Sequence, residues 1–192
     1  MRGSEIQIKR WKRLEYEQLI EQGVFMPGER VELIDGLLLV AEPQSSSHYS
    51  AVRLAQLALT RAFGDGWDVR AQGPVALDDA SEPEPDVSVV RGGPRDYVAA
   101  HPADPVLILE VALSSLVFDR EHKSSLYARA GRPEYWIVNL ADRVLEIRQY
   151  PAPSPSAPYG WDYSLLAVLG PRDHARPLAA PASLIAVVDL LP

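Results

Sequence analysis

The chain contains no cysteine, which excludes disulfide bonds and thiolate metal ligands. Any metal ion would therefore be held by oxygen or nitrogen ligands. The sequence has no Gly-rich phosphate loop and no Gly-x-Ser-x-Gly elbow, which argues against nucleotide-binding and serine-hydrolase classes. A zinc site is not expected either, because no His-x-x-x-His spacing links His48, His101, His122 and His174.

Long hydrophobic runs are also absent. No stretch of about eighteen apolar residues occurs, and the N-terminal segment lacks the pattern of a secretion signal. We therefore expect a cytoplasmic protein without a membrane span. Basic residues are outnumbered, with 19 Lys and Arg against 26 Asp and Glu, and the formal net charge is −7. This charge argues against a surface coated for nonspecific nucleic-acid binding, although a local basic groove remains compatible with it.

The order of helical and strand patterns predicts one α/β domain over residues 1–192, built on a mixed β-sheet flanked by helices. An N-terminal helix and a β-hairpin precede the sheet, and the hairpin turns at Asp35-Gly36, a dipeptide that accepts positive φ. Serines at 45–47 provide N-caps for the second helix. The expected helices are 14–22, 45–63 and 119–130, and the expected strands are 30–34, 37–40, 67–77, 86–90, 106–113, 134–140 and 144–150.

The character of the chain changes after residue 150. Residues 151–158 form a Pro/Ser-rich segment, which we expect to run extended on the surface. Residues 159–192 are expected to be a C-terminal extension packed on the core, with late strand or helix additions at 159–169 and 183–190. The apolar stretch 184–188 is a candidate subunit interface.

The most informative residue is Glu110, because it lies inside the apolar run 106–113 without any cationic neighbour in that run. Such a run is typical of a strand that is covered on both faces. An ionised carboxylate there costs several kcal/mol unless a cation, a metal ion or hydrogen bonds replace its lost hydration. We therefore expect a partner opposite Glu110, either a cationic side chain in a buried ion pair or a divalent metal ion shared with a second acid.

Two further residues are candidates for that site. Asp86 opens the expected strand 86–90 directly after a proline, and Lys123 lies on the helix that follows the Glu110 strand. If the two strands are neighbours, Asp86 and Glu110 converge at one edge of the sheet. Two such oxygen ligands, completed by waters and a substrate phosphate, describe a magnesium site, and a nearby lysine would orient the attacking water.

At these residues the chain resembles the PD-(D/E)XK nuclease superfamily and, more closely, its Uma-type endonuclease branch. The resemblance covers about residues 14–150 and implies a restriction-endonuclease-like core, metal-dependent phosphodiester cleavage with Mg²⁺ or Mn²⁺, and Asp86 and Glu110 as metal ligands. It also suggests Glu32 and His48 as outer members of the site. The segments that carry it are VELIDG at 31–36, EPDV at 84–87, LEVALS at 109–114, KSSLY at 123–127 and EYWIV at 134–138.

Two features depart from the superfamily pattern. The usual lysine lies two residues after the acid on the same strand, where this chain has Ala112. In the Uma-type branch the lysine looks to have moved from the strand to the next helix. The resemblance therefore implies the catalytic role for Lys123. The turn after the acidic strand, commonly Ser-Pro-Ser-like in this branch, is Ser114-Ser115-Leu116 here, and no ligand is lost by this change.

Each outer candidate also has a structural interpretation. Asp86 alone is compatible with a simple strand start, and Lys123 with a solvated helix face. Glu32 lies in a hairpin strand, where a solvent-facing glutamate is the default. His48, near a helix start, is more often a surface or capping residue, although it could reach a phosphate of a nucleic acid.

We therefore predict a metal-dependent endonuclease that cleaves phosphodiester bonds in nucleic acid, with DNA as the expected substrate. Its predicted catalytic residues are Asp86, Glu110, Lys123 and Glu32. The alternative is a catalytically inactive protein with the same fold that acts as an oligomeric binding or interaction module. A homodimer is a further expectation, because it would present two sites to two strands.

Overall fold

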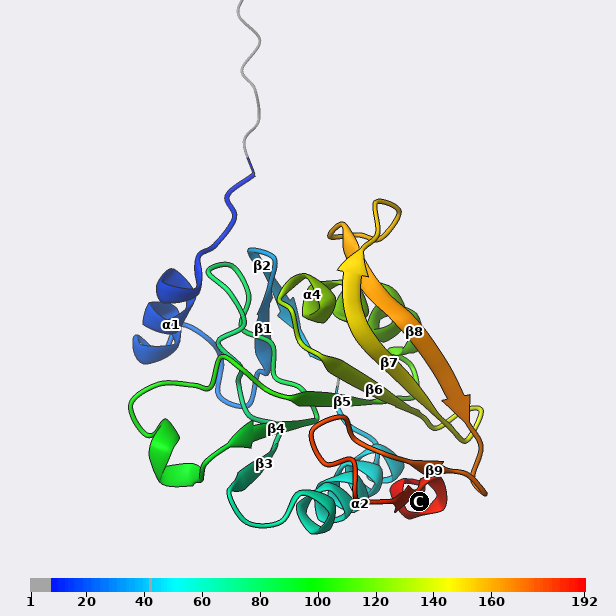
Figure 1. The fold of residues 1–192 in the computed structure, drawn as a ribbon. Coiled ribbons are helices and arrows are strands. Elements are labelled where there is room, and N and C mark those ends of the chain that lie inside the picture. Colours follow the sequence, from blue (N-terminus) through cyan, green and yellow to red (C-terminus); the bar gives the residue numbers. More distant parts are fainter. Residues whose placement is uncertain (1–7, 42) are drawn as a thin grey trace, which may run out of the picture.

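The computed structural model describes residues 8–41 and 43–192. Its centre is a six-stranded mixed sheet with the strand order β3-β4-β5-β6-β7-β8 (Figure 1). Strands β5 and β6 are parallel, and the other four neighbouring pairs of this sheet are antiparallel. The strands are β3 (Trp67–Ala71), β4 (Val87–Arg91), β5 (Leu107–Ala112), β6 (Glu134–Asn139), β7 (Val144–Pro153) and β8 (Trp161–Leu169). This arrangement confirms the predicted mixed α/β fold.

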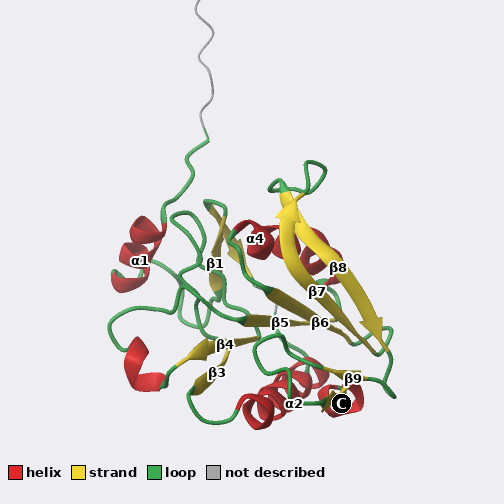
Figure 2. Ribbon diagram, in the orientation of Figure 1, coloured by secondary structure: helices red, strands yellow, loops and turns green. Residues whose placement is uncertain are grey.

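Helices cover both faces of the sheet (Figure 2). On one face, α2 (Ser46–Phe63) packs a small apolar stripe that includes Ala51, Ala55 and Leu59 against the sheet. The Ser45 hydroxyl caps this helix as predicted, because it accepts a hydrogen bond from the backbone N–H of His48. On the other face, a helical segment that connects β5 to β6 buries Leu126 and Tyr127.

This connecting segment has three parts: α3 (Leu116–Phe118), the π-helical turn η2 (Asp119–Lys123) and α4 (Ser124–Arg129). The sequence predicts a start at Asp119, whereas the segment begins three residues earlier, at Leu116. In the π turn, the backbone N–H of Ser124 donates to the carbonyl of Asp119 instead of to residue 120. Such turns are rare and occur frequently at functional sites.

The N-terminal helix α1 (Arg13–Glu21) and the hairpin of β1 (Val31–Ile34) and β2 (Leu37–Val40) confirm two further predictions. Asp35 and Gly36 have φ values of 48° and 79°, as a tight hairpin turn requires. Tyr16 of α1 donates a hydrogen bond to the Val31 carbonyl at 2.5 Å, which joins the helix to the hairpin. The hairpin forms a two-stranded sheet of its own, and this hydrogen bond joins it to α1.

Some predicted boundaries differ in the structure. The strand predicted over 67–77 ends at Ala71, because Gln72 takes a positive φ of 52° and turns the chain away. Residues 151–153 are not part of a surface loop, since they continue β7 and pair with residues 161–163 of β8. The sheet therefore extends to Leu169, beyond the core boundary placed at residue 150.

The remaining elements are short. They are η1 (Pro94–Tyr97), β9 (His174–Ala175), β10 (Ile185–Ala186) and η3 (Val187–Leu190). The candidate interface at 184–188 is divided, since Ile185 and Val187 are buried in the core while Leu184 and Val188 are exposed. No helix in the described part of the chain is both long and apolar enough to cross a membrane.

Candidate active site

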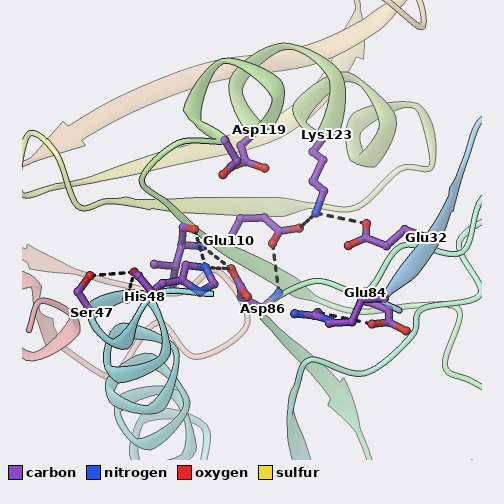
Figure 3. Close-up of polar contacts among 12 residues, drawn as sticks. Glu32, Ser47, His48, Glu84, Asp86, Glu110, Asp119 and Lys123 are labelled. Carbon is purple, nitrogen blue, oxygen red and sulfur yellow. Dashed lines mark hydrogen bonds and ion pairs between the residues drawn. The ribbon is translucent and has the colours of Figure 1, made fainter. Parts of the chain in front are cut away.

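Asp86 and Glu110 meet where strands β4 and β5 begin to diverge (Figure 3). The last register pair at this end joins Val87 to Leu109, so Asp86 and Glu110 each lie one residue beyond it. The backbone N–H of Asp86 donates to Glu110 Oε2 at 3.2 Å, and the N–H of Val111 donates to Asp86 Oδ2 at 2.8 Å. Both side chains are buried, and backbone donors of the opposite strand hold each of them in place.

Lys123 and Tyr127 approach Glu110 from the helical segment above the sheet. The Lys123 ammonium donates to Glu110 Oε1 at 2.8 Å, and the Tyr127 hydroxyl donates to the same oxygen at 2.8 Å. Lys123 Nζ also lies 3.4 Å from Glu32 Oε2 on β1. Lys123 and Glu32 are both buried, so the sequence-based defaults of a solvated helix face and a solvent-facing glutamate are wrong for these residues.

His48 reaches the acid pair from the first turn of α2. Its Nε2 lies 3.0 Å from Asp86 Oδ2 and 2.9 Å from the Val111 carbonyl oxygen. Burial lowers the pKa of His48, but the hydrogen bond and charge of Asp86 outweigh burial and raise the pKa above its ordinary value. The position of His48 therefore makes it a residue of the site. Its backbone N–H also donates a hydrogen bond to the Ser45 hydroxyl, which caps the helix.

Three charged residues of this cluster were missed by sequence analysis as site candidates. Asp119 was expected only as the start of the helix 119–130, yet it is buried and accepts a hydrogen bond from the Ser115 hydroxyl at 2.6 Å. Arg30 and Glu84 lie 3.5 Å apart at the entrance to the cluster. A weak signal for Glu84 existed in the sequence, because it lies two residues before Asp86.

The cluster lines a cavity of ≈ 480 Å³ that is open to solvent. Its charged lining is dominated by carboxylates, with Arg30 and Lys123 as the permanent cations among the described residues. The acidic lining residues are Glu32, Glu84, Asp86, Glu110 and Asp119, while Leu39, Val40, Leu113 and Phe118 contribute apolar walls. The cavity thus combines a strongly acidic floor with apolar sides.

The acids of the cavity are buried close to one another, and this shifts the pKa values of Glu110 and Asp119. Burial raises the pKa of Glu110 to about 8, against the opposing effect of Lys123, and the nearby charges of Asp86 and Asp119 add to the rise. Burial likewise raises the pKa of Asp119. Burial alone would lower the pKa of Lys123, but Glu110, Glu32 and Asp119 hold it well above its ordinary value. Lys123 is therefore a permanent cation that faces more acid than it can neutralise.

The donor atoms fit a hard divalent cation better than a soft one. No group of three or more His, Asp or Glu side chains within residues 8–41 and 43–192 is arranged to hold a metal ion. However, Asp86 Oδ2 and the Val111 carbonyl oxygen both lie about one hydrogen-bond length from His48 Nε2. Carboxylate and carbonyl oxygens are ligands that Mg²⁺ accepts, with waters completing its coordination.

The chain is thus an α/β protein with a mixed sheet flanked by helices, and a buried acid pair at the centre of the sheet faces an open cavity. The chain matches the family model of Uma2, described as "Putative restriction endonuclease", over residues 14–170. This match spans most of the chain, and the protein therefore belongs to the Uma2 family.

The fold is shared with a solved structure, the crystal structure of a putative nuclease belonging to DUF820 from Anabaena variabilis ATCC 29413. The TM-score is 0.69, the sequence identity is 13%, and the similarity covers 94% of this chain and 97% of that chain. At this identity the likeness establishes the fold alone. No curated protein matches this chain.

Proposed function

We propose that this protein is a metal-dependent endonuclease that hydrolyses phosphodiester bonds in nucleic acid, with DNA as the expected substrate. The observation that carries the proposal is the meeting of Asp86, Glu110, His48 and Lys123 at the floor of one open cavity. Membership of a family of restriction-endonuclease-like proteins supports the same reaction class. A buried acid pair inside a cavity, in which Glu110 has a raised pKa, is also a general mark of a functional site.

Asp86 and Glu110 would hold Mg²⁺ or Mn²⁺, with the Val111 carbonyl oxygen as a further ligand. When bound, the metal ion would polarise the phosphodiester and lower the pKa of a bound water. Lys123 would orient the attacking water and offset negative charge on the phosphate oxygens, because its ammonium is positive and fixed against Glu110. Glu32 holds Lys123 from the other side.

His48 would contact the substrate inside the cavity that it lines. It lies in the first turn of α2, where backbone N–H groups and the helix dipole favour a phosphate. Its raised pKa adds positive character to that position. We therefore assign His48 to nucleic-acid binding and positioning of Asp86, while Asp86, Glu110 and Lys123 act on the reacting phosphate.

One observation favours the alternative of a catalytically inactive interaction module. Lys123 already forms ion pairs with Glu110 and Glu32, as expected of a structural charge network. The two functions differ in their dependence on metal. A catalytic site must bind a divalent cation through Asp86 and Glu110, whereas a structural ion pair needs none and loses stability when Glu110 becomes Gln.

The test is calorimetric titration of Mn²⁺ into the wild type and into Asp86→Asn. The endonuclease predicts saturable binding that Asp86→Asn abolishes without loss of folding, followed by Mn²⁺-dependent cleavage of DNA. Asp65→Asn is the matched control, because Asp65 is exposed and does not line the cavity. If wild type binds no Mn²⁺, either alone or with a non-cleavable phosphorothioate oligonucleotide present, the interaction module is the better conclusion.

A further inference from the structure

The β7–β8 hairpin packs against the helical segment that connects β5 to β6 and carries Lys123 (Figure 1). The contact is made by the loop that joins the two strands and by the start of β8. Asp162 Oδ1 accepts a hydrogen bond from the Ser124 hydroxyl at 2.8 Å. The backbone N–H of Tyr159 donates to the Ser125 hydroxyl at 2.9 Å, and both serines are fully buried. The hairpin therefore holds the helical segment at the two residues that directly follow Lys123.

The contact at Ser124 lies at the end of the π turn η2. The Ser124 N–H donates to the Asp119 carbonyl, so this turn contains one residue more than an α-helical turn. Because an α-helix turns by about 100° per residue, the extra residue changes which side chains face the sheet after the turn. Both ends of the turn are tied to strands, since the Tyr135 hydroxyl of β6 donates to the Asp119 carbonyl at 3.2 Å and Asp162 of β8 accepts from Ser124. A form this rare needs such contacts from other elements to persist.

The backbone of this turn determines where the Lys123 ammonium lies. Its Nζ donates to Glu110 Oε1 at 2.8 Å and lies 3.4 Å from Glu32 Oε2, inside the buried acidic cluster. A lysine ammonium is strongly hydrated and its stem is flexible, so it stays in a buried place only when the backbone directs it there. We propose that Asp162 is a positioning residue for Lys123, which holds the π turn through the Ser124 hydroxyl and so directs the ammonium at Glu110. As a part of catalysis, this role rests on the proposed function.

Asp162 is suited to this role because its own side chain is fixed. Its Oδ1 also accepts a hydrogen bond from the backbone N–H of Tyr163 at 2.8 Å. A hydroxyl that donates to an ionised carboxylate forms a stronger hydrogen bond than one that donates to a neutral group. The hairpin has a further contact in the same region, since the Tyr163 hydroxyl donates to the Arg132 carbonyl at 3.0 Å. Loss of the Asp162 carboxylate should therefore loosen the turn at Ser124 without releasing the hairpin.

The first test measures the accessibility of the Lys123 amine and needs no substrate. Lysines are acetylated with an N-hydroxysuccinimide ester, and mass spectrometry gives the rate at Lys123 relative to the exposed Lys12. Wild type should protect Lys123, and Asp162→Leu should raise its relative rate roughly tenfold or more, because the turn opens locally. Ser164→Ala is the matched control on the same strand, since its hydroxyl donates to the Tyr150 carbonyl of β7 and not to the helical segment. This control should leave the rate unchanged.

A double-mutant cycle isolates the bond between Asp162 and Ser124. Ser124→Ala should raise the labelling of Lys123 as Asp162→Leu does, and the double variant should add little to either change. Asp162→Asn retains an oxygen that can accept from the Ser124 hydroxyl, so it should label close to wild type. Thermal melting identifies the variants that fold, and Ser124→Ala alone carries the test if Asp162→Leu does not. Unchanged labelling of Lys123 in the folded variants would overturn the proposal.

A second measurement connects this role to the reaction. Asp162→Leu should lower kcat and kcat/KM for Mn²⁺-dependent DNA cleavage equally, roughly ten- to a hundredfold, because a displaced ammonium no longer reaches the reacting phosphate. Mn²⁺ affinity should not fall, since Asp86 and Glu110 are unchanged. Faster labelling of Lys123 without cleavage by any protein, wild type included, would retain the positioning role and reject the endonuclease. Cleavage by wild type with equal kcat in Asp162→Leu would overturn the catalytic part of the role.

Discussion

Two buried glutamates lie on the same sheet in opposite electrostatic situations. Glu110 on β5 is 3% exposed and Glu146 on β7 is 2% exposed. Glu146 accepts hydrogen bonds from Arg120 at 2.5 and 3.1 Å and lies 3.4 Å from Arg148. Although burial raises the pKa of Glu146, hydrogen bonds from Arg120 and Asn139 outweigh burial and lower it overall. The pKa of Glu110 is instead raised.

The difference shows that burial alone does not mark a functional carboxylate. Glu146 forms ion pairs with two arginines, Arg120 and Arg148, so its charge is neutralised within the fold. Glu110 shares Lys123 with Glu32 and faces further acids across an open cavity. A surplus of negative charge beside accessible space is an arrangement that an external cation would complete. The following variants test this distinction, from the largest expected effect to the smallest.

Asp86→Asn should reduce the rate of Mn²⁺-dependent DNA cleavage roughly a thousandfold, corresponding to about 4 kcal/mol of transition-state stabilisation. Asparagine keeps the shape of the side chain and can still accept the hydrogen bond from the Val111 N–H, so the fold should persist. Initial cleavage rates measure the effect, with thermal melting as the check on folding. Undiminished cleavage by Asp86→Asn would remove Asp86 from the metal site.

Glu146→Gln should leave cleavage unchanged and lower the free energy of unfolding by roughly 2 kcal/mol, because it leaves two arginines without their carboxylate. This figure is discounted for solvent screening, since the Arg120 side chain is 40% exposed. Urea denaturation at pH 7 measures the loss. Because the pKa of Glu146 is lowered in the fold, its contribution is present above the ordinary value of about 4.3 and disappears as pH falls below it.

Urea denaturation of Glu110→Gln at pH 7 sharpens the contrast between Glu110 and Glu146. The raised pKa of Glu110 means that the fold disfavours its charged form, so replacing it by neutral glutamine should cost less stability than Glu146→Gln. A larger loss in Glu110→Gln would show that the Glu110–Lys123 pair is structural, as the interaction-module alternative requires.

Tyr127→Phe should weaken Mn²⁺ binding roughly tenfold, because the hydroxyl orients Glu110 Oε1 without touching the proposed metal position. Calorimetric titration measures this change, and the ring volume is retained. Tyr163→Phe is the matched control, since it removes a hydroxyl that donates to the Arg132 carbonyl away from the cavity. Equal affinities in both variants would show that Tyr127 has only a packing role.

The variant Glu82→Gln tests whether a raised pKa alone identifies a residue of the active site. Burial, reinforced by Glu17, raises the pKa of Glu82 to about 7, yet Glu82 does not line the cavity. A carboxyl with a raised pKa in the fold destabilises the protein increasingly as pH rises from about 4.3 to 7. Glu82→Gln should therefore melt above wild type at pH 8, by about 2–4 °C for each kcal/mol relieved, and match it at pH 4. Cleavage should be unaffected, and any change in rate would extend the site to Glu82.

The acid pair can be predicted from the sequence because its signals are local. An acid in an apolar strand and an acid after a proline are visible without knowledge of the fold, and the structure brings Glu110 and Asp86 together. The surroundings of Glu32 are not local, since its cationic partner Lys123 lies far from it in the sequence. The inward position of Asp119 depends on the early helix start and the π turn, and neither has a recognisable sequence pattern.

The continuation of β7 was missed because proline normally ends a strand. Pro151 and Pro153 are tolerated because the pairing of β6 with β7 ends at Gln149. The N–H of Tyr150 still donates to the Pro133 carbonyl, but from Pro151 on β7 pairs with β8 alone, so a missing N–H on the other side leaves no strand partner unpaired. Likewise, the burial of Glu146 could not be distinguished from that of Glu110 until Arg120 and Arg148 were placed.

The parallel pairing of β5 with β6 determines when the cluster can be completed during synthesis. Parallel strands require a long crossover, and here the crossover is the helical segment that carries Lys123. A nascent chain that ends before β6 already contains both acids and Lys123, but it lacks Tyr135 and Ile137, which pack with Leu126 and Tyr127 of the crossover. A translation product truncated there would therefore carry the acids and the lysine without the part of the core that β6 adds under the crossover.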